Sequence, residues 1–219
     1  MKTIEADMMM KRSTLRTLLL HTITVAVTVA VTVTVPAVPS HACVGRKLIL
    51  GSVQTGRADM ASRLLSILIN ERTGTTVEVK FFEDAAGLLD AVGKGKVDLY
   101  VDHVDNALIR MGRSGDSESL GGEERFKLVK RLFDEELNLI WLKPMGYSGR
   151  DAGGASLGPA AVVVKKDTLK KFPALPRLLE KIGTRVPLDD DRLDDLVKRA
   201  QSEKPARVAR DFLKEVKLI

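Results

Sequence analysis

Apolar residues recur with two different periods along the first half of the chain, and these periods predict alternating strands and helices. Short apolar or alternating runs indicate strands, whereas stripes spaced by three and four residues indicate helices. A strand, a helix and a second parallel strand form a right-handed crossover, so this order predicts an α/β fold with a mainly parallel sheet. The expected strands are 47–51, 76–82 and 97–101, and the expected helices are one capped by Asp59 that extends to Ile69 and a shorter one over 85–92.

The second half of the chain is expected to add two strands and a set of C-terminal helices. Strands over 138–142 and 160–164 flank a segment, 144–158, that contains five glycines. This composition predicts a linker or an exposed loop. Asp189 is suited to cap one C-terminal helix, and Pro205 is suited to begin another.

Polar side chains follow the third expected strand directly. They are Asp102, His103, Asp105 and Asn106. Ligands of open α/β sheets bind beyond the carboxyl ends of the strands, so this cluster is a candidate small-molecule site. The alternative is an ordinary turn between a strand and a helix, with Asp105 as the N-cap.

Residues 1–42 have the order of a secretory signal. Three basic residues between positions 11 and 16 precede an apolar stretch, and small residues lead to Ala42. We expect cleavage before Cys43 and export to the periplasm or cell envelope, with a retained transmembrane helix as the alternative. Cys43 is the only cysteine, which excludes an internal disulfide. A lipid anchor on Cys43 and a soluble periplasmic protein are both compatible with Ser40-His41-Ala42, which matches a lipoprotein signal only in part.

Charge and motif content exclude several classes of function. The net charge of +6 falls to +4 once residues 1–42 are removed, and the remaining charges alternate in sign without a long basic block. We therefore expect no nucleic-acid partner. His103 is the only histidine beyond residue 42, and no metal-ligand, nucleophile-elbow or phosphate-loop motif is present. We expect no enzyme activity, no cofactor and no metal, because the acidic residues between 189 and 195 are explained by a helix dipole.

Five short blocks resemble one family. Leu48–Ser52 is similar to its first strand and Gly-Ser turn, and Gly95–Tyr100 is similar to its Gly-Glu-Ile-Asp-Leu-Tyr block. Trp141–Pro144 resembles the strand that enters the second lobe, Pro159–Ile182 resembles the return from that lobe, and Ala209–Leu213 resembles the final helix. The family is the glycine betaine/choline type of substrate-binding protein of ABC importers. The resemblance implies a single lobe over 43–219 of the periplasmic-binding-protein-like (type II) fold, a small solute, and a transporter membrane subunit as partner.

The chain departs from the family in two ways. Family members have a second lobe after the Trp-Leu-x-Pro block, whereas here only the glycine-rich bridge 143–158 occupies that interval. The family also places a tyrosine in its pocket where this chain has His103, which is a poorer partner for a quaternary ammonium group. Asp102 and Asp105 could attract a cation by charge, and Tyr147 and Trp141 are the remaining aromatic candidates.

Two hypotheses follow. The first is a non-catalytic solute-binding component of an ABC importer for a small zwitterionic or cationic solute. The second is a one-lobed interaction or adaptor module of the cell envelope that no longer binds solute, in which a former interdomain face pairs with another copy or with a transporter subunit. The start of the helix after Arg57 could hold a carboxylate through its backbone N–H groups. The ligand-binding candidates are Ser52, Gln54, Thr55, Arg57, Asp102, His103, Asp105, Asn106 and Tyr147.

Overall fold

A five-stranded sheet is the centre of the domain. The computed structural model describes residues 47–117, 119–150, 154–186 and 188–219, and the expected signal segment and Cys43 lie outside them. The strand order is β2-β1-β3-β5-β4. The strands are β1 (Leu48–Val53), β2 (Val77–Phe82), β3 (Leu99–His103), β4 (Leu139–Arg150) and β5 (Ser156–Lys165).

The sheet is mixed rather than mainly parallel. β1 pairs in parallel with β2 and with β3, which confirms the crossovers expected from the sequence. β5 instead runs antiparallel to both of its neighbours, β3 and β4. The difference arises because β4 and β5 form a hairpin, and the returning strand of a hairpin is antiparallel by necessity.

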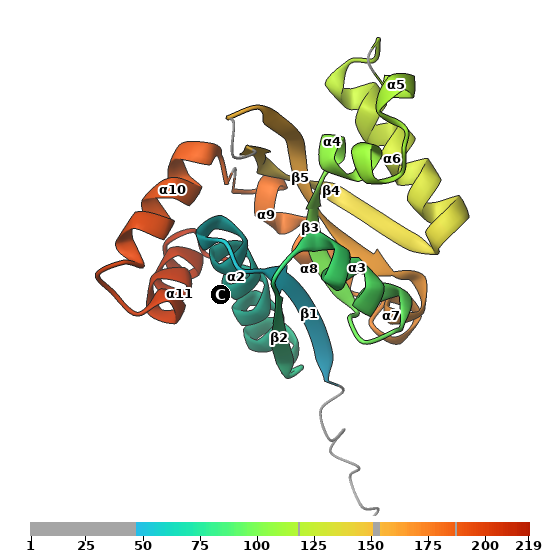
Figure 1. Cartoon of the computed structure of the whole chain (residues 1–219). Coiled ribbons are helices and arrows are strands. Elements are labelled where there is room, and N and C mark those ends of the chain that lie inside the picture. The colour runs from blue at the N-terminus through green and yellow to red at the C-terminus, as the bar shows by residue number, and fades with distance from the viewer. Residues whose placement is uncertain (1–46, 118, 151–153, 187) are drawn as a thin grey trace, which may run out of the picture. The chain divides into compact units, whose positions relative to one another are not determined.

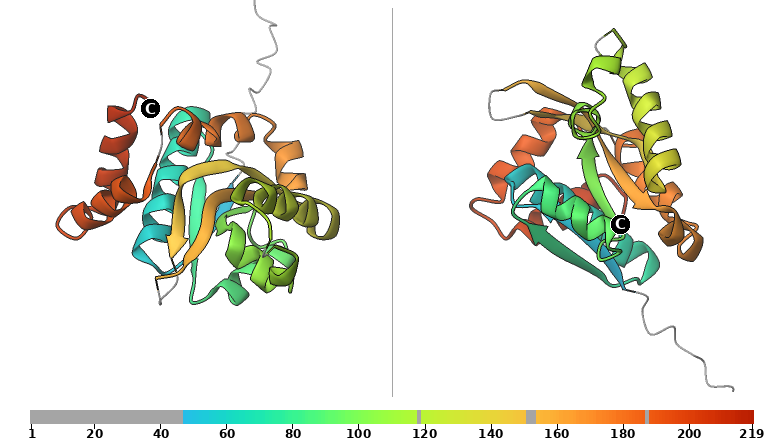
Figure 2. Two further views of the ribbon diagram at one scale, coloured as in Figure 1. Left: turned by 90° about the horizontal axis from the view of Figure 1, so that it is seen from above. Right: turned by 45° about the vertical axis from the view of Figure 1, so that its right-hand side comes forward.

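Helices cover both faces of the sheet (Figure 1 and Figure 2). α2, α8, α10 and α11 share one hydrophobic core with alternate strand residues such as Leu48, Leu50 and Leu99. α3, α4 and α6 share a second core, with Tyr100, Phe133 and Trp141, on the opposite face. The helices are α2 (Gly56–Thr73), α3 (Ala85–Gly93), α4 (Val104–Arg110), α5 (Ser114–Ser117), α6 (Gly122–Leu137), α7 (Lys166–Lys171), α8 (Leu175–Leu179), α9 (Lys181–Thr184), α10 (Asp190–Arg199) and α11 (Pro205–Glu215).

The described part of the chain forms one compact α/β unit. Of the helices there, none has both the length and the apolar character that a membrane crossing requires. Asp189 is the N-cap of α10, where its side chain accepts a hydrogen bond from the backbone N–H of Arg192, and Pro205 begins α11. Both expectations for the C-terminal helices are thus confirmed.

Two expected caps were wrong. α2 begins at Gly56, and its N-cap is Thr55, whose hydroxyl accepts from the N–H of Ala58. Asp59 lies inside the first turn. The third strand extends to His103, which is itself the N-cap of α4, so Asp105 also lies in a first helical turn rather than at the cap. Acidic side chains stabilise a helix both at the N-cap and in the first turn, because both lie near the positive end of the helix dipole.

The interval expected to be a loop is mostly strand. β4 continues to Arg150 and β5 begins at Ser156, so the expected loop over 144–158 is a long hairpin instead. The register of the pair shifts at three places: between Trp141 and Pro144, between Pro144 and Ser148, and between Ser148 and Arg150. Bulges of this kind allow proline and glycine inside a strand.

Candidate functional site

A cavity of about 440 Å³ opens at the carboxyl ends of β1 and β3. Its walls come from the first turn of α2, from α3 and α4, and from the β4–β5 hairpin. This is the place predicted for a ligand in an open α/β sheet. Six of the nine sequence-predicted residues line it: Thr55, Arg57, Asp102, His103, Asn106 and Tyr147.

The other three candidates do not line the cavity. Ser52 is buried in β1, and its hydroxyl donates to the carbonyl of Val53. Gln54 is exposed outside the cavity. Asp105 forms an ion pair with Arg125 of α6, at 2.8 Å. Ser52 and Asp105 therefore make contacts within the lobe, and Gln54 faces solvent outside the cavity wall.

The carboxylate of Asp102 is already bound inside the protein. One of its oxygens pairs with the guanidinium of Arg110, and the other accepts the backbone N–H of His103 at 2.8 Å. Burial raises the pKa of Asp102 to about 6, against the opposing effect of Arg110. The expectation that Asp102 attracts a cation is weakened, because Arg110 neutralises its charge.

His103 is held between Tyr147 and the backbone of β4. Its ring meets that of Tyr147 edge-on, with the centroids 5.9 Å apart. A Cβ atom on Gly149 would lie 2.5 Å from the ring, so only glycine allows this approach. Burial, followed by the charges of Arg110 and Arg57, lowers the pKa of His103 to about 4. His103 is therefore a neutral imidazole near pH 7, and its buried Nε2 has no hydrogen-bond partner.

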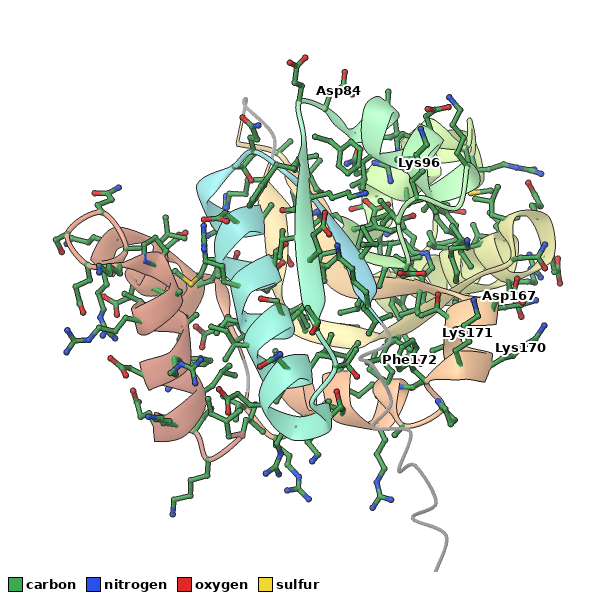
Figure 3. All side chains as sticks on the ribbon, turned by 90° about the horizontal axis from the view of Figure 1, so that it is seen from below. Asp84, Lys96, Asp167, Lys170, Lys171 and Phe172 are labelled. Carbon is green, nitrogen blue, oxygen red and sulfur yellow. The ribbon has the colours of Figure 1, made fainter. Side chains whose placement is uncertain are left out.

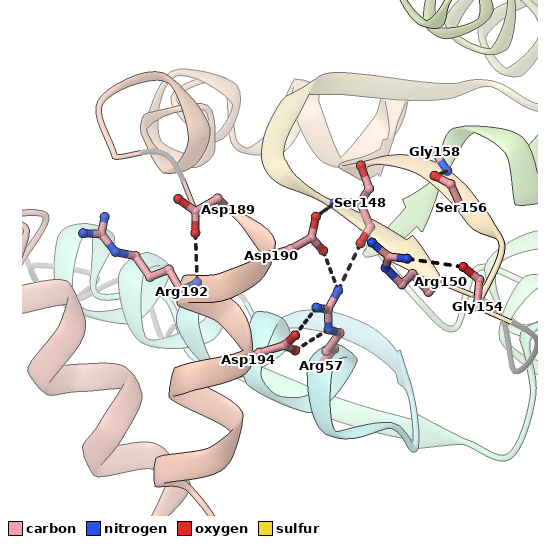
Figure 4. A network of polar contacts seen from close by, with 10 residues as sticks. All are labelled: Arg57, Ser148, Arg150, Gly154, Ser156, Gly158, Asp189, Asp190, Arg192 and Asp194. Carbon is pink, nitrogen blue, oxygen red and sulfur yellow. Dashed lines mark hydrogen bonds and ion pairs between the residues drawn. The ribbon is translucent and has the colours of Figure 1, made fainter.

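Arg57 connects three elements rather than standing free in the cavity (Figure 4). Its Nε and Nη2 atoms donate to the two carboxylate oxygens of Asp194, and Nη1 donates to Asp190 and to the carbonyl of Ser148. The hydrogen bond to Asp194 is the main reason why the pKa of Arg57 is raised. Four of its five N–H groups are thus bound within the chain, although the sequence predicted a ligand-binding residue.

Three polar lining residues were missed by the sequence reasoning. Arg110 and Arg150 are cationic side chains of the wall. Tyr100 also lines the cavity, and its buried hydroxyl has no hydrogen-bond partner among the described residues. Arg110 follows Asp102 by eight positions, a spacing that joins a strand end to the far end of the next helix and matches no familiar motif. Tyr100 belongs to the Asp-Leu-Tyr block, and the sequence pattern predicts it only as part of a buried strand.

Nothing in the described residues favours a metal ion. No group of three or more histidine, cysteine, aspartate or glutamate side chains converges among them. Asp190 and Asp194, the acidic pair nearest the cavity, are bound to Arg57.

Comparisons with known proteins agree with this geometry. Residues 151–215 match the family model described as the substrate binding domain of ABC-type glycine betaine transport systems. No curated protein matches the sequence. Among solved structures, apo YehZ from Escherichia coli has a TM-score of 0.67 at 13% identity, over 80% of this chain and all of that chain. A glycine betaine/carnitine/choline ABC transporter structure has a TM-score of 0.67 at 11% identity, over 80% of this chain and 99% of that one.

These structural similarities establish the fold. The family match is limited to residues 151–215, so the C-terminal part of the chain is similar in sequence to the substrate binding domain of ABC-type glycine betaine transport systems.

Proposed function

We propose that this protein is the solute-binding component of an ABC-type importer and that it takes a small zwitterionic or cationic solute of the glycine betaine and choline class. The observation that carries the proposal is the position of the 440 Å³ cavity, at the carboxyl ends of β1 and β3, in a lobe whose C-terminal part is similar to the substrate binding domain of ABC-type glycine betaine transport systems. In this proposal the protein acts outside the cytoplasm after loss of residues 1–42, with or without a lipid on Cys43, and delivers solute to a transporter membrane subunit.

The cavity wall offers different partners to the two ends of a zwitterion. Arg150 is an exposed cation whose only described hydrogen bond is a long one, 3.4 Å, to the carbonyl of Gly154. It is the natural partner for a carboxylate. Tyr147 and Tyr100 line the cavity and are its aromatic candidates for a quaternary ammonium group, since a well-placed cation–π contact contributes roughly 0.5–2 kcal/mol. Because the pKa of His103 is low, its neutral ring does not repel a cation.

A thermal-shift titration with glycine betaine, choline, carnitine and a set of amino acids tests the proposal. A ligand at one hundred times its Kd stabilises a protein by about 2.7 kcal/mol, which raises the Tm of a domain of this size by roughly 5–11 °C. Tyr147→Leu removes the aromatic face and is expected to reduce the shift, whereas Tyr147→Phe keeps the face and is expected to retain it. Gln54→Ala, outside the cavity, is the control that should change nothing.

The interaction module remains the second candidate because one observation favours it. Arg57 and Asp102, two charged residues of the wall, are both paired within the chain. A protein that melts cooperatively but shows no shift with any of these solutes would contradict the solute-binding proposal and leave this alternative, including the homodimer it allows.

A further inference from the structure

A second, larger cavity lies on the face of the sheet that α3, α4 and α6 cover. Its volume is about 720 Å³. Its walls come from these three helices, from the first residue of β4, and from the junction of β5 with α7. Only Leu89 and Arg110 are shared with the candidate solute cavity, so the two are separate spaces with one common wall.

The floor of the second cavity is apolar. Val92, Phe133 and Leu139 are each less than a tenth exposed and form part of the second core. Leu137, in contrast, is 46% exposed and stands at the wall of the cavity. The apolar surface therefore continues from the core to the solvent at Leu137.

The rim of the cavity is basic. Four cationic and two acidic side chains line it. Three of the cations have partners, since Arg110 pairs with Asp102, Lys166 with Asp134, and Lys170 with Asp167. Figure 3 shows Asp167 and Lys170 together on α7 at the edge of the domain.

Lys165 is different from these three. It is the last residue of β5 and is half-buried, and within the described part of the chain its ammonium group has no hydrogen bond or ion pair. A half-buried cation beside an apolar floor is suited to an anion whose body is apolar.

We infer that this second cavity binds an amphiphilic carboxylate, with an alkyl body on the floor of Val92, Phe133 and Leu139 and a head group at Lys165. Among the described cations of the rim, Lys165 is the one without a hydrogen bond or ion pair, and the charge of the head complements it, while the body covers the apolar surface that ends at Leu137. The site is independent of the proposed transport function, because it uses a different cavity and a different cation.

The probe is octanoate, titrated into the purified protein below its micelle concentration and followed by calorimetry. Octan-1-ol has the same body without the charge, and acetate has the head without the body. We expect octanoate to bind roughly tenfold more tightly than octan-1-ol, since a hydrogen bond to a charged group contributes on this scale. Acetate is expected not to bind measurably.

Two variants and one control test whether octanoate binds in the second cavity. Lys165→Met is expected to weaken octanoate about tenfold and to leave octan-1-ol unchanged, a pattern that a folding defect would not give. Leu137→Glu changes an exposed position and is expected to weaken octanoate by charge repulsion at the mouth. Lys96→Met makes the same substitution as Lys165→Met at an exposed lysine outside the cavity (Figure 3), so it should behave as wild type.

Three outcomes would overturn the inference. They are an octanoate affinity equal to that of octan-1-ol, an octanoate affinity unchanged in Lys165→Met, and binding that is insensitive to Leu137→Glu. The last result would mean that octanoate occupies the first cavity or another surface.

Discussion

Arg57 and Asp194 are 137 positions apart in the sequence, yet they form a two-point ion pair with N–O distances of 2.6 and 2.5 Å. The pair fastens the first turn of α2 to α10, and the same guanidinium reaches Asp190 and β4. Planar two-point pairing of this kind has a geometry that lysine cannot reproduce. Arg57 therefore fixes the C-terminal helices against the wall of the candidate solute cavity.

The ion pairs of Arg57 with Asp190 and Asp194 form a clamp, and its loss should destabilise the lobe moderately. Arg57→Met is expected to lower the free energy of unfolding by about 1–2 kcal/mol, because it removes several charge-assisted bonds from a side chain that is 26% exposed. Asp194→Asn should cost less, under about 1 kcal/mol, since Asp194 is more exposed and Asp190 still pairs with Arg57. Urea denaturation measures both. Lys127→Met breaks an exposed pair with Glu123 and serves as the control with no expected effect. Equal stability of Arg57→Met and wild type would show that the clamp is only a surface contact.

Gly149→Ala should destabilise the protein through His103. The added Cβ would lie 2.5 Å from the imidazole, and crowding of this kind costs about 1–3 kcal/mol. In a His103→Ala background the same substitution should cost close to nothing, so a double-mutant cycle isolates the contact. Gly93→Ala, at the end of α3 with no atom within 4 Å of the new Cβ, is the matched control. A cost of Gly149→Ala that persists without His103 would refute this explanation.

The pH dependence of stability should contain two opposing contributions. His103 has a folded pKa of about 4, below its unfolded value, so its contribution to stability is lost as the pH falls from 6.5 toward 4. Asp102 has a folded pKa of about 6, above its unfolded value, so its contribution is lost as the pH rises through 6. Between pH 4 and 6 the folded protein carries one more proton on Asp102 and one fewer on His103 than the unfolded chain does. The two effects on the free energy of unfolding therefore nearly cancel.

Single variants should separate these contributions. In Asp102→Asn the free energy of unfolding should fall by about 3 kcal/mol, relative to wild type, as the pH drops from 6.5 to 4. In His103→Gln it should instead rise by a similar amount, relative to wild type, as the pH drops from 6.5 to 4. Urea denaturation at several pH values measures both curves. Parallel curves for the two variants would show that neither group titrates as its burial suggests.

Arg110→Met should be the most damaging of the charge substitutions. Asp102 is 5% exposed, and removing its partner leaves a buried carboxylate unpaired, which costs about 3–5 kcal/mol. Arg110→Met combined with Asp102→Asn should be more stable than Arg110→Met alone, because no buried charge then remains. A double variant that is less stable than the single one would mean that Arg110 acts through its packing and not through its charge. Circular dichroism melting curves are sufficient for this comparison.

Periodicity was sufficient to predict the parallel half of the sheet. The parallel direction of β1, β2 and β3 follows from the order of strands and helices, and the polar residues at the ends of β1 and β3 indicated the place of the cavity. The outer half of the β4–β5 hairpin was missed because proline and glycine are typical of loops. A period-two signal was present there, since Met145, Tyr147 and Gly149 are buried while the residues between them are not.

The charge pairs could not be predicted in the same way. Asp102 and Arg57 line the cavity, but their contacts are with Arg110 and with Asp190 and Asp194, which reach them only through the packing of α4 and α10. Sequence spacing carries no information on such contacts. Their effect is that both expected free charges are instead paired within the chain.

The pairing of Arg150 with Ser156 has a consequence for how the lobe could change during evolution. The chain leaves the sheet after Arg150 and returns to it at Ser156, which are paired with each other. An insertion at the tip would begin and end at one place and would leave every pairing of β3, β4 and β5 intact. The hairpin is therefore a point where a whole domain can be gained or lost without refolding the rest, and grafting a small folded domain between Arg150 and Ser156 should preserve the lobe.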